Sequence, residues 1–272
     1  KFSSSLMIIS AFSLVGSQMD KIILSKIVSI ESFGYYTLAS FIALRIYTIF
    51  TPVVAAVNPE LIKRVKKNNK KRLIEFYHKC CQIISVLLFP LSLTVAFFSF
   101  EILLIWTQDL ELATNSYLVV TFLAISTTFN ALLNIPYKLQ LAYKWTSLAL
   151  SINVVGFIFL VPAFYFAIDK FSIYGAAATY MVYNLIALVV SIYVMHKRLI
   201  INEKSKWIIK DVMIPLFASL IIIALGRYFI KFNGNQVLIV FLVILLYLFA
   251  LLITAIIVPH TRKILIRALP IN

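Results

Sequence analysis

The chain has 272 residues, of which 62% are hydrophobic and only 13% are charged. A soluble domain has about 45–50% apolar and about 25% charged residues, and here the apolar excess runs along the whole length. This composition excludes a soluble domain with one membrane anchor and predicts a polytopic membrane protein. The net charge of +15 is informative through its position, because Lys and Arg are retained on the cytoplasmic side of a membrane.

Eight segments are long and apolar enough to cross a bilayer, which takes about 20 residues of helix. They are residues 3–28, 34–57, 74–105, 112–142, 146–168, 174–196, 211–231 and 236–258. The sequence therefore predicts an all-α, polytopic transmembrane helical bundle. Cys80 and Cys81 lie in the third segment, and adjacent cysteines form neither a staple nor a CxxC motif, so we expect two buried thiols.

Basic residues gather in alternate connections between these segments. Seven of the ten residues at 63–72 are Lys or Arg, and the stretch 196–210 and the tail after residue 258 are also basic. The connections between them are acidic or nearly neutral. This alternation predicts that Lys1, the 63–72 connection and the tail lie in the cytoplasm. Membrane orientation explains the basic run without a nucleic-acid partner. Contact with anionic lipid headgroups is a second interpretation of this run.

The first segment carries a polar row. Ser10, Ser13 and Ser17 recur at steps of three and four, and the row continues to Asp20 and Lys21, so these residues share one helical face. The row fits either close helix packing or a cavity wall. Asp20 and Lys21 stand about 100° apart around a helix of 3.6 residues per turn, so each needs a partner elsewhere.

Arg45 lies about 16 Å into the second segment at 1.5 Å per residue. An arginine at that depth costs about 2.5–3.5 kcal/mol, so we expect it to face the protein interior and to have a partner. Two interpretations stay open. Arg45 pairs with Asp20 and locks the first two helices, or Arg45 and Lys21 offer positive charge to an anionic substrate.

The fourth segment carries a second polar face, with Thr127, Asn130, Asn134 and Lys138 at steps of three, four and four. Amides and hydroxyls suit contacts to sugar or phosphate, and they equally hydrogen-bond neighbouring helices. Asn184 in the sixth segment is a single polar residue, which is more typical of a bond between helices than of a ligand contact.

The sequence contains no recognisable catalytic motif. His78, His196 and His260 are scattered near the expected cytoplasmic ends, without metal-ligand spacing, and there is no Gly-rich phosphate loop. The connections are too short to hold a catalytic domain. We expect no catalytic residue, no metal, no cofactor and a protein that is not an enzyme.

Several short stretches occur in an order that resembles a known family. They are residues 20–24 (DKIIL), 33–39 (FGYYTLA), Pro59 before the basic run, 102–106 (ILLIW), 140–142 (QLA) and 174–178 (YGAAA). In this order and spacing the chain, over residues 1–200, resembles bacterial polysaccharide exporters of the O-antigen flippase (Wzx) type. Those exporters belong to the multidrug/oligosaccharidyl-lipid/polysaccharide (MOP) transporter superfamily.

The resemblance implies an architecture and an activity. Such proteins have two six-helix lobes and often two more helices, so residues 1–200 would be a MATE-like second lobe, residues 201–272 the two additional helices, and the first lobe would lie outside this chain. They flip undecaprenyl-pyrophosphate-linked oligosaccharide, an O-antigen or other surface polysaccharide unit, across the bacterial inner membrane by alternating access. The implied partners are this lipid-linked oligosaccharide, membrane lipids and other glycan-assembly membrane proteins.

The resemblance also suggests roles for the polar residues. The expected contacts are Arg45 and Lys21 for the anion, Asn130, Asn134, Thr127 and Ser17 for a polar cavity, and Asp20 as counter-charge or ion-coupling site. The alternatives are a cation-coupled multidrug exporter, a peptidoglycan-precursor flippase and, in a different class, a membrane glycan polymerase or ligase. A cationic drug would favour an acidic cavity, whereas two cations against one carboxylate favour an anionic substrate. A polymerase or ligase would need a long outer loop.

Overall fold

The structure is a computed structural model that describes residues 7, 9, 15–16, 18–230 and 236–268. Every regular element in these residues is a helix, which confirms the predicted all-α bundle. The helices are α2 (Met19–Ile27), α3 (Ile30–Leu44), α4 (Ile46–Lys66), α5 (Lys70–Phe97), α6 (Ser99–Thr107), α7 (Leu110–Leu132), α8 (Asn134–Ala142), α9 (Ser147–Arg198), α10 (Lys204–Lys206), the π-helix η1 (Trp207–Met213), α11 (Ile214–Phe229), α12 (Gln236–Ile257) and α13 (Pro259–Ala268).

Local sequence explains where several helices begin. Ser29, Asn69 and Asp109 each precede a helix, and each side chain accepts a hydrogen bond from the backbone N–H three residues further on. Such caps satisfy one of the N–H groups that the first turn leaves without a partner. Three of the short connections therefore lie where the apolar pattern predicted them.

Six helices in the described ranges are long and apolar enough to cross a membrane. One of them, α9, consists of two arms that meet at Ser172, whose φ of 52° lies in the left-handed region. The arms correspond to the predicted segments 146–168 and 174–196. α4 runs nine residues beyond the predicted end at 57, because Lys and Arg are good helix formers although they are not apolar.

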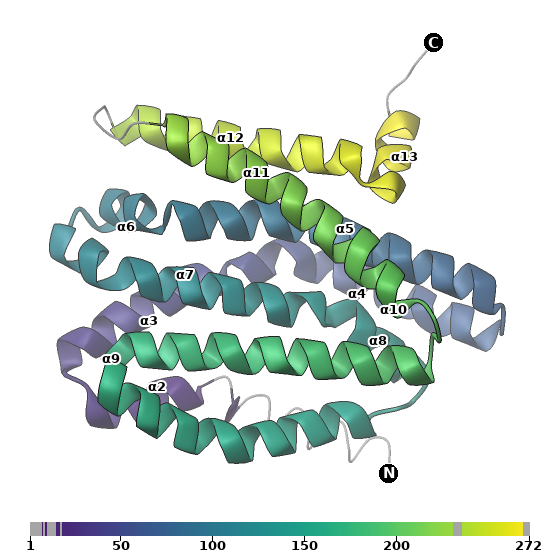
Figure 1. Ribbon diagram of the computed structural model, residues 1–272, viewed down its shortest axis with the longest axis horizontal. Coiled ribbons are helices and arrows are strands. Elements are labelled where there is room, and N and C mark those ends of the chain that lie inside the picture. Colours follow the sequence, from purple (N-terminus) through teal and green to yellow (C-terminus); the bar gives the residue numbers. More distant parts are fainter. Residues whose placement is uncertain (1–6, 8, 10–14, 17, 231–235, 269–272) are drawn as a thin grey trace.

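The helices lie side by side along the long axis of the molecule (Figure 1). The α4–α5, α8–α9 and α9–α10 connections lie at one end together with α13, and the α2–α3 and α6–α7 connections and the Ser172 reversal lie at the other. The basic connections thus share one end, as their alternation predicts. The orientation of that end in the membrane stays a prediction.

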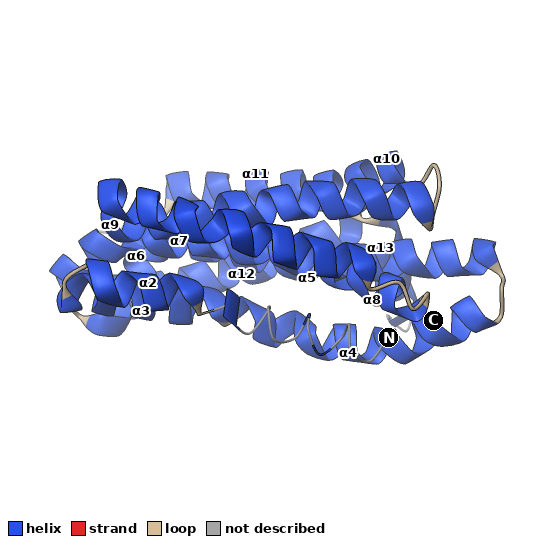
Figure 2. Ribbon diagram, turned by 90° about the horizontal axis from the view of Figure 1, so that it is seen from below, coloured by secondary structure: helices blue, strands red, loops and turns tan. Residues whose placement is uncertain are grey.

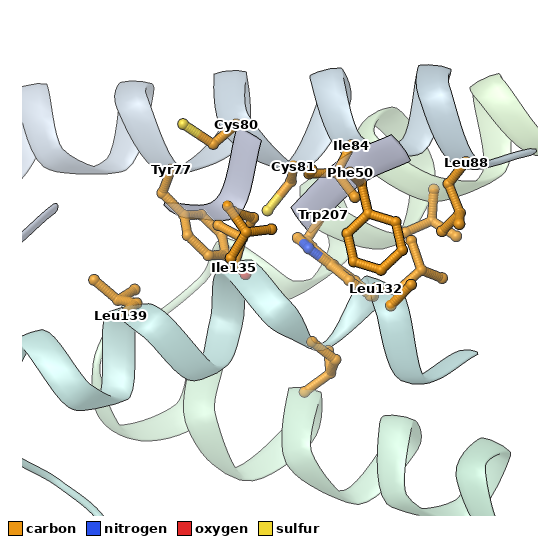
Figure 3. Close-up of a cluster of buried hydrophobic side chains, with 14 of the residues drawn as sticks. Phe50, Tyr77, Cys80, Cys81, Ile84, Leu88, Leu132, Ile135, Leu139 and Trp207 are labelled. Atoms are coloured by element: carbon orange, nitrogen blue, oxygen red, sulfur yellow. The ribbon is translucent and has the colours of Figure 1, made fainter. Parts of the chain in front are cut away.

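A continuous apolar core fills the half of the bundle near the basic connections. Figure 3 shows Phe50, Tyr77 and Cys81 facing the side chains of α7 and α8. Cys80 and Cys81 are free and buried, as the sequence predicted. Since lipid is as apolar as these side chains, close packing rather than escape from water stabilises such a core.

The last two long helices form a pair that packs on α5 (Figures 1 and 2). Within the pair, Ser219 Oγ and Thr254 Oγ1 lie 3.0 Å apart. At the end opposite the basic connections, Arg227 Nη1 donates to Glu101 Oε1 at 2.6 Å, which ties α11 to α6. The division into a lobe at 1–200 and an added pair at 201–272 remains a prediction.

Candidate functional site: a polar cavity between α2, α4, α7 and α9

A cavity of about 460 Å³ lies among α2, α3, α4, α7, α8 and both arms of α9. Its polar lining consists of Asp20, Lys21, Ser40, Tyr47, Thr127, Asn130, Asn134, Tyr137, Gln140, Asn153, Tyr180, Tyr183, Asn184 and Ser191. Among the described residues that line it, Asp20 and Lys21 are the only Asp, Glu, Lys, Arg or His. The rest of the polar surface is amide and hydroxyl, so the cavity can donate and accept many hydrogen bonds while carrying little net charge.

Asn130 is the centre of the hydrogen-bond network in this cavity. Its Oδ1 accepts from the Tyr47 hydroxyl at 2.7 Å, and its Nδ2 donates to Asn184 Oδ1 at 3.2 Å. Asn184 in turn donates to Ser126 Oγ at 2.8 Å. The chain of bonds joins α4, α7 and the second arm of α9, which fixes the amide groups in direction. Fixed donors and acceptors favour selective recognition of hydroxyl groups.

Asp20 lies at the α2 side of the cavity and is only 5% exposed. The Tyr36 hydroxyl donates to its Oδ2 at 2.6 Å, whereas Oδ1 has no hydrogen-bond partner in the described structure. The next residue, Lys21, also lines the cavity and is half-buried. A buried carboxylate oxygen that is left without a donor can accept a hydrogen bond from a ligand hydroxyl or bind a cation or proton.

Arg45 lies where α3 ends and α4 begins, outside the cavity lining. Its side chain is exposed, and its guanidinium carbon stands 4.0 Å from the centroid of the Phe41 ring. No ion pair joins it to Asp20 in the described part of the chain. The expectation that Arg45 faces the interior therefore differs from the structure. The physical reason is helical phase, because Ala43 and Ile46 take the buried positions on either side of it.

The structure brings together most of the residues that the sequence singled out. Asp20, Lys21, Thr127, Asn130 and Asn134 all line the cavity, and Ser17, like Ser10 and Ser13, lies outside the described residues. Which of them contact substrate stays a prediction.

Lys138 does not line the cavity, although it continues the polar row of α7. α7 ends at Leu132 and α8 begins at Asn134, and the interruption at Leu133 lies three residues before Pro136. Tyr137 and Gln140 point into the cavity instead.

Further lining residues were missed from the sequence. Asn184 was expected only to join helices, yet it both joins helices and lines the cavity. A signal was present, because Tyr180, Tyr183, Asn184 and Ser191 lie on one helical face at steps of three, one and seven. Tyrosine in a membrane segment is usually interpreted as an apolar or interfacial residue, so the sequence did not identify this helical face as polar.

A second buried polar cluster lies near the basic connections. The His78 and Asp211 side chains are both fully buried, and His78 Nδ1 contacts Asp211 Oδ2. His78 Nε2 lies 2.9 Å from Glu203 Oε2, and Gln82 Nε2 donates to Asp211 Oδ1 at 2.9 Å. Lys206 Nζ lies 3.2 Å from the same Glu203 oxygen. The cluster joins α5 to the connection before α10 and to η1.

The histidines that looked scattered in the sequence therefore meet in this region. His196 Nε2 lies 3.4 Å from the Tyr77 hydroxyl, and the backbone N–H of His260 donates to Gln82 Oε1 at 3.2 Å. Asp211 reaches His78 from a π-helical turn, a geometry that is common at functional positions. Among the described residues, no group of three or more His, Cys, Asp or Glu side chains is arranged to hold a metal ion.

Membrane-length helices packed around an internal polar cavity are the architecture of a multi-pass membrane protein. Comparison with known proteins agrees with this class. Residues 1–109 match the family model described as "Polysaccharide biosynthesis protein". This match confirms the resemblance to polysaccharide exporters for that part of the chain.

The fold is similar to the solved structure "Lipid II flippase MurJ, inward closed conformation". The TM-score is 0.76 at 16% sequence identity, and the match covers 94% of this chain and 53% of the flippase. The chain thus spans about half the length of that protein. At this identity the likeness shows a shared fold. Among curated proteins, none matched the chain.

Proposed function

We propose that this chain is one lobe of a transporter, not an enzyme, that flips a lipid-linked oligosaccharide across the bacterial cytoplasmic membrane by alternating access. The observation that carries the proposal is the lining of the central cavity by amides and hydroxyls on a fixed network around Asn130 and Asn184. Sugar hydroxyls both donate and accept hydrogen bonds, and amide side chains do the same. The polysaccharide family match over residues 1–109 and the flippase fold support this reading.

Two charged residues in the cavity have different proposed roles. Lys21 is the cationic group of the lining and would contact the pyrophosphate of the substrate, because an ammonium is a suitable partner for phosphate oxygens. Asp20 would accept a sugar hydroxyl or serve as the coupling-ion site through its unpartnered oxygen. Arg45 would contact the anion from outside the described cavity lining. We propose an O-antigen or another surface polysaccharide unit as the cargo.

A peptidoglycan-precursor flippase is the second candidate, and the shared fold favours it. Such a precursor is also a lipid-linked pyrophosphate sugar, so the same cavity chemistry would serve. An exporter of cationic drugs fits less well, because the lining has one carboxylate opposed by one ammonium.

Gene deletion separates the candidates. In the source bacterium, loss of a polysaccharide flippase should remove surface glycan and cause lipid-linked units to accumulate while the cell wall stays intact. Loss of a peptidoglycan-precursor flippase should cause lysis. Loss of a drug exporter should lower drug resistance alone.

Substitutions in the full-length protein test the cavity itself. Asn130→Ala and Lys21→Ala should each lower glycan display by about 10-fold or more, since a lost hydrogen bond to a charged or buried group costs about 1.5–3 kcal/mol. Asn115→Ala is the matched control, because this asparagine lies outside the cavity lining. Normal display by Asn130→Ala at normal membrane levels would contradict the proposal. Normal display by Arg45→Ala would remove Arg45 from the anion contacts.

A further inference from the structure

A second, separate pocket lies at the tip of the hairpin formed by α4 and α5. Its volume is about 350 Å³, and its lining consists of Glu60, Lys63, Arg64, Lys67, Asn69 and Arg72. The tip projects further along the long axis than the other connections at its end of the bundle (Figures 1 and 2). The volume lies within the range of about 300–1,000 Å³ that is typical of ligand pockets.

The pocket concentrates positive charge. Four cationic side chains and one carboxylate line it, and that carboxylate is already engaged, because Arg64 Nε lies 2.9 Å from Glu60 Oε1. Lys63, Lys67 and Arg72 form no ion pair in the described part of the chain. Membrane orientation needs positive charge on this connection, but it does not need the cations to converge on one hollow.

The start of α5 adds to the same field. Of the pocket cations, Arg72 lies in the first turn of this helix, where the helix dipole is positive and a cation is unfavourable. The Arg72 N–H is already capped by Asn69 Oδ1, so the dipole, not a free N–H of this residue, adds to the positive potential. An anion in the pocket would relieve the repulsion among the lining cations.

Contacts within the protein hold the Arg64 side chain in place in the absence of a ligand. Arg64 Nη1 donates to the Arg72 carbonyl oxygen at 3.3 Å, and the guanidinium carbon lies 4.3 Å from the centroid of the Phe76 ring. Together with the Glu60 contact, this fixes the plane of the guanidinium. A fixed, planar guanidinium is suited to the oxygens of a phosphate group.

We propose that this hairpin pocket is a binding site for a phosphate-bearing anion, separate from the central cavity. Arg64 and Arg72 would bind the phosphate oxygens, and Lys63 and Lys67 would neutralise its charge. The phosphate could belong to a lipid headgroup or to a soluble phosphate compound, since both present the same oxygens. The proposal does not rest on the transport function, because it concerns a different set of residues.

Two variants of equal charge test the site. Lys63→Gln/Lys67→Gln removes two lining cations, and Lys66→Gln/Lys71→Gln removes two cations of the same run that do not line the pocket. The full-length protein is studied in nanodiscs. Binding of inorganic pyrophosphate is measured by calorimetry in phosphatidylcholine nanodiscs, and binding of phosphatidic acid is measured by native mass spectrometry.

We expect the lining variant to weaken binding at least about 10-fold in one or both assays, and the control variant to change it by less than about 3-fold. Loss of pyrophosphate binding identifies a soluble ligand, loss of phosphatidic acid binding identifies a headgroup, and loss of both identifies the shared phosphate chemistry. Equal weakening by both variants would show attraction by the whole basic run and would overturn the proposal. Absence of binding to either probe would overturn it as well.

Discussion

Removing one partner of the buried pair between His78 and Asp211 should strongly destabilise the attachment of α11 and α12 to the bundle. Both side chains are fully buried, and they join α5 to the π-helix that opens the C-terminal pair. Each ring nitrogen of His78 faces a carboxylate oxygen, so the imidazole bridges two carboxyl groups.

The expected cost follows from this geometry. Breaking a buried ion pair typically costs about 3–5 kcal/mol, because it leaves a buried charge without compensation. In Asp211→Ala the imidazole keeps its contact with Glu203, whose side chain is 23% exposed, and in His78→Ala the carboxylate keeps Gln82. We therefore expect about 3 kcal/mol, at the lower end of that range, for each single variant. The double variant should cost less than their sum by at least about 1 kcal/mol, since it leaves neither charge behind.

The assay is reversible unfolding of the full-length protein in mixed micelles, measured for the wild type, both single variants and the double variant. Asp169→Ala is the control, because this exposed carboxylate has no ion pair in the described structure, and it should change the free energy of unfolding by less than about 0.5 kcal/mol. Additive single effects, or single effects below about 1 kcal/mol, would refute the reasoning that the pair couples the two parts.

Three further predictions concern other positions. Partial burial raises the pKa of the Glu203 carboxyl group, but hydrogen bonds from a histidine and a lysine outweigh burial and hold this pKa below its ordinary value. The stabilisation that Glu203 contributes is therefore complete above the ordinary glutamate pKa and is lost as the pH falls through the lower folded-state pKa. Glu203→Gln should flatten this acid limb of the stability curve, and an unchanged curve would contradict it. Gly175→Ala should destabilise the protein by about 1–3 kcal/mol, because a Cβ at this position clashes with the Ala167 carbonyl oxygen. Gly34→Ala places its Cβ in open space and should stabilise α3 by about 0.5–1 kcal/mol. Thermal melting in detergent checks both, and equal melting temperatures would refute the difference. Tyr36→Phe removes the hydroxyl that donates to the buried carboxyl group of Asp20 and should cost about 1–3 kcal/mol in the same micelle unfolding assay, because a buried acceptor loses its donor. A cost below about 0.5 kcal/mol would contradict it.

Much of the fold could be predicted from the sequence, because the determinants are local. Apolar length predicts each membrane helix, and the alternation of basic connections predicts which connections share an end of the bundle. The polar face of α7 pointed to Thr127 and Asn130 in the cavity for the same reason, since helical periodicity decides which residues lie together. The end of α4 was missed, because its last turns are basic rather than apolar.

The direction of Arg45 could not be predicted from its depth. The expectation of an interior position assumed one straight helix from 34 to 57, whereas the chain breaks at Arg45 itself. The step of four from Asn134 likewise did not show that Lys138 lies off the cavity while Tyr137 and Gln140 line it. Breaks of this kind depend on packing against neighbouring helices, which periodicity within one segment does not report.

The sequence by itself determined the class of molecule, the extent of most helices and the polar faces that line the cavity, because hydropathy and helical period act over a few turns. Only the tertiary structure decided which polar groups meet. Asn130 bonds Asn184 across 54 positions, and His78 contacts Asp211 across 133. Such pairs form because a buried polar group in a membrane must find a partner, and that partner is whichever group the packing of distant helices brings within reach.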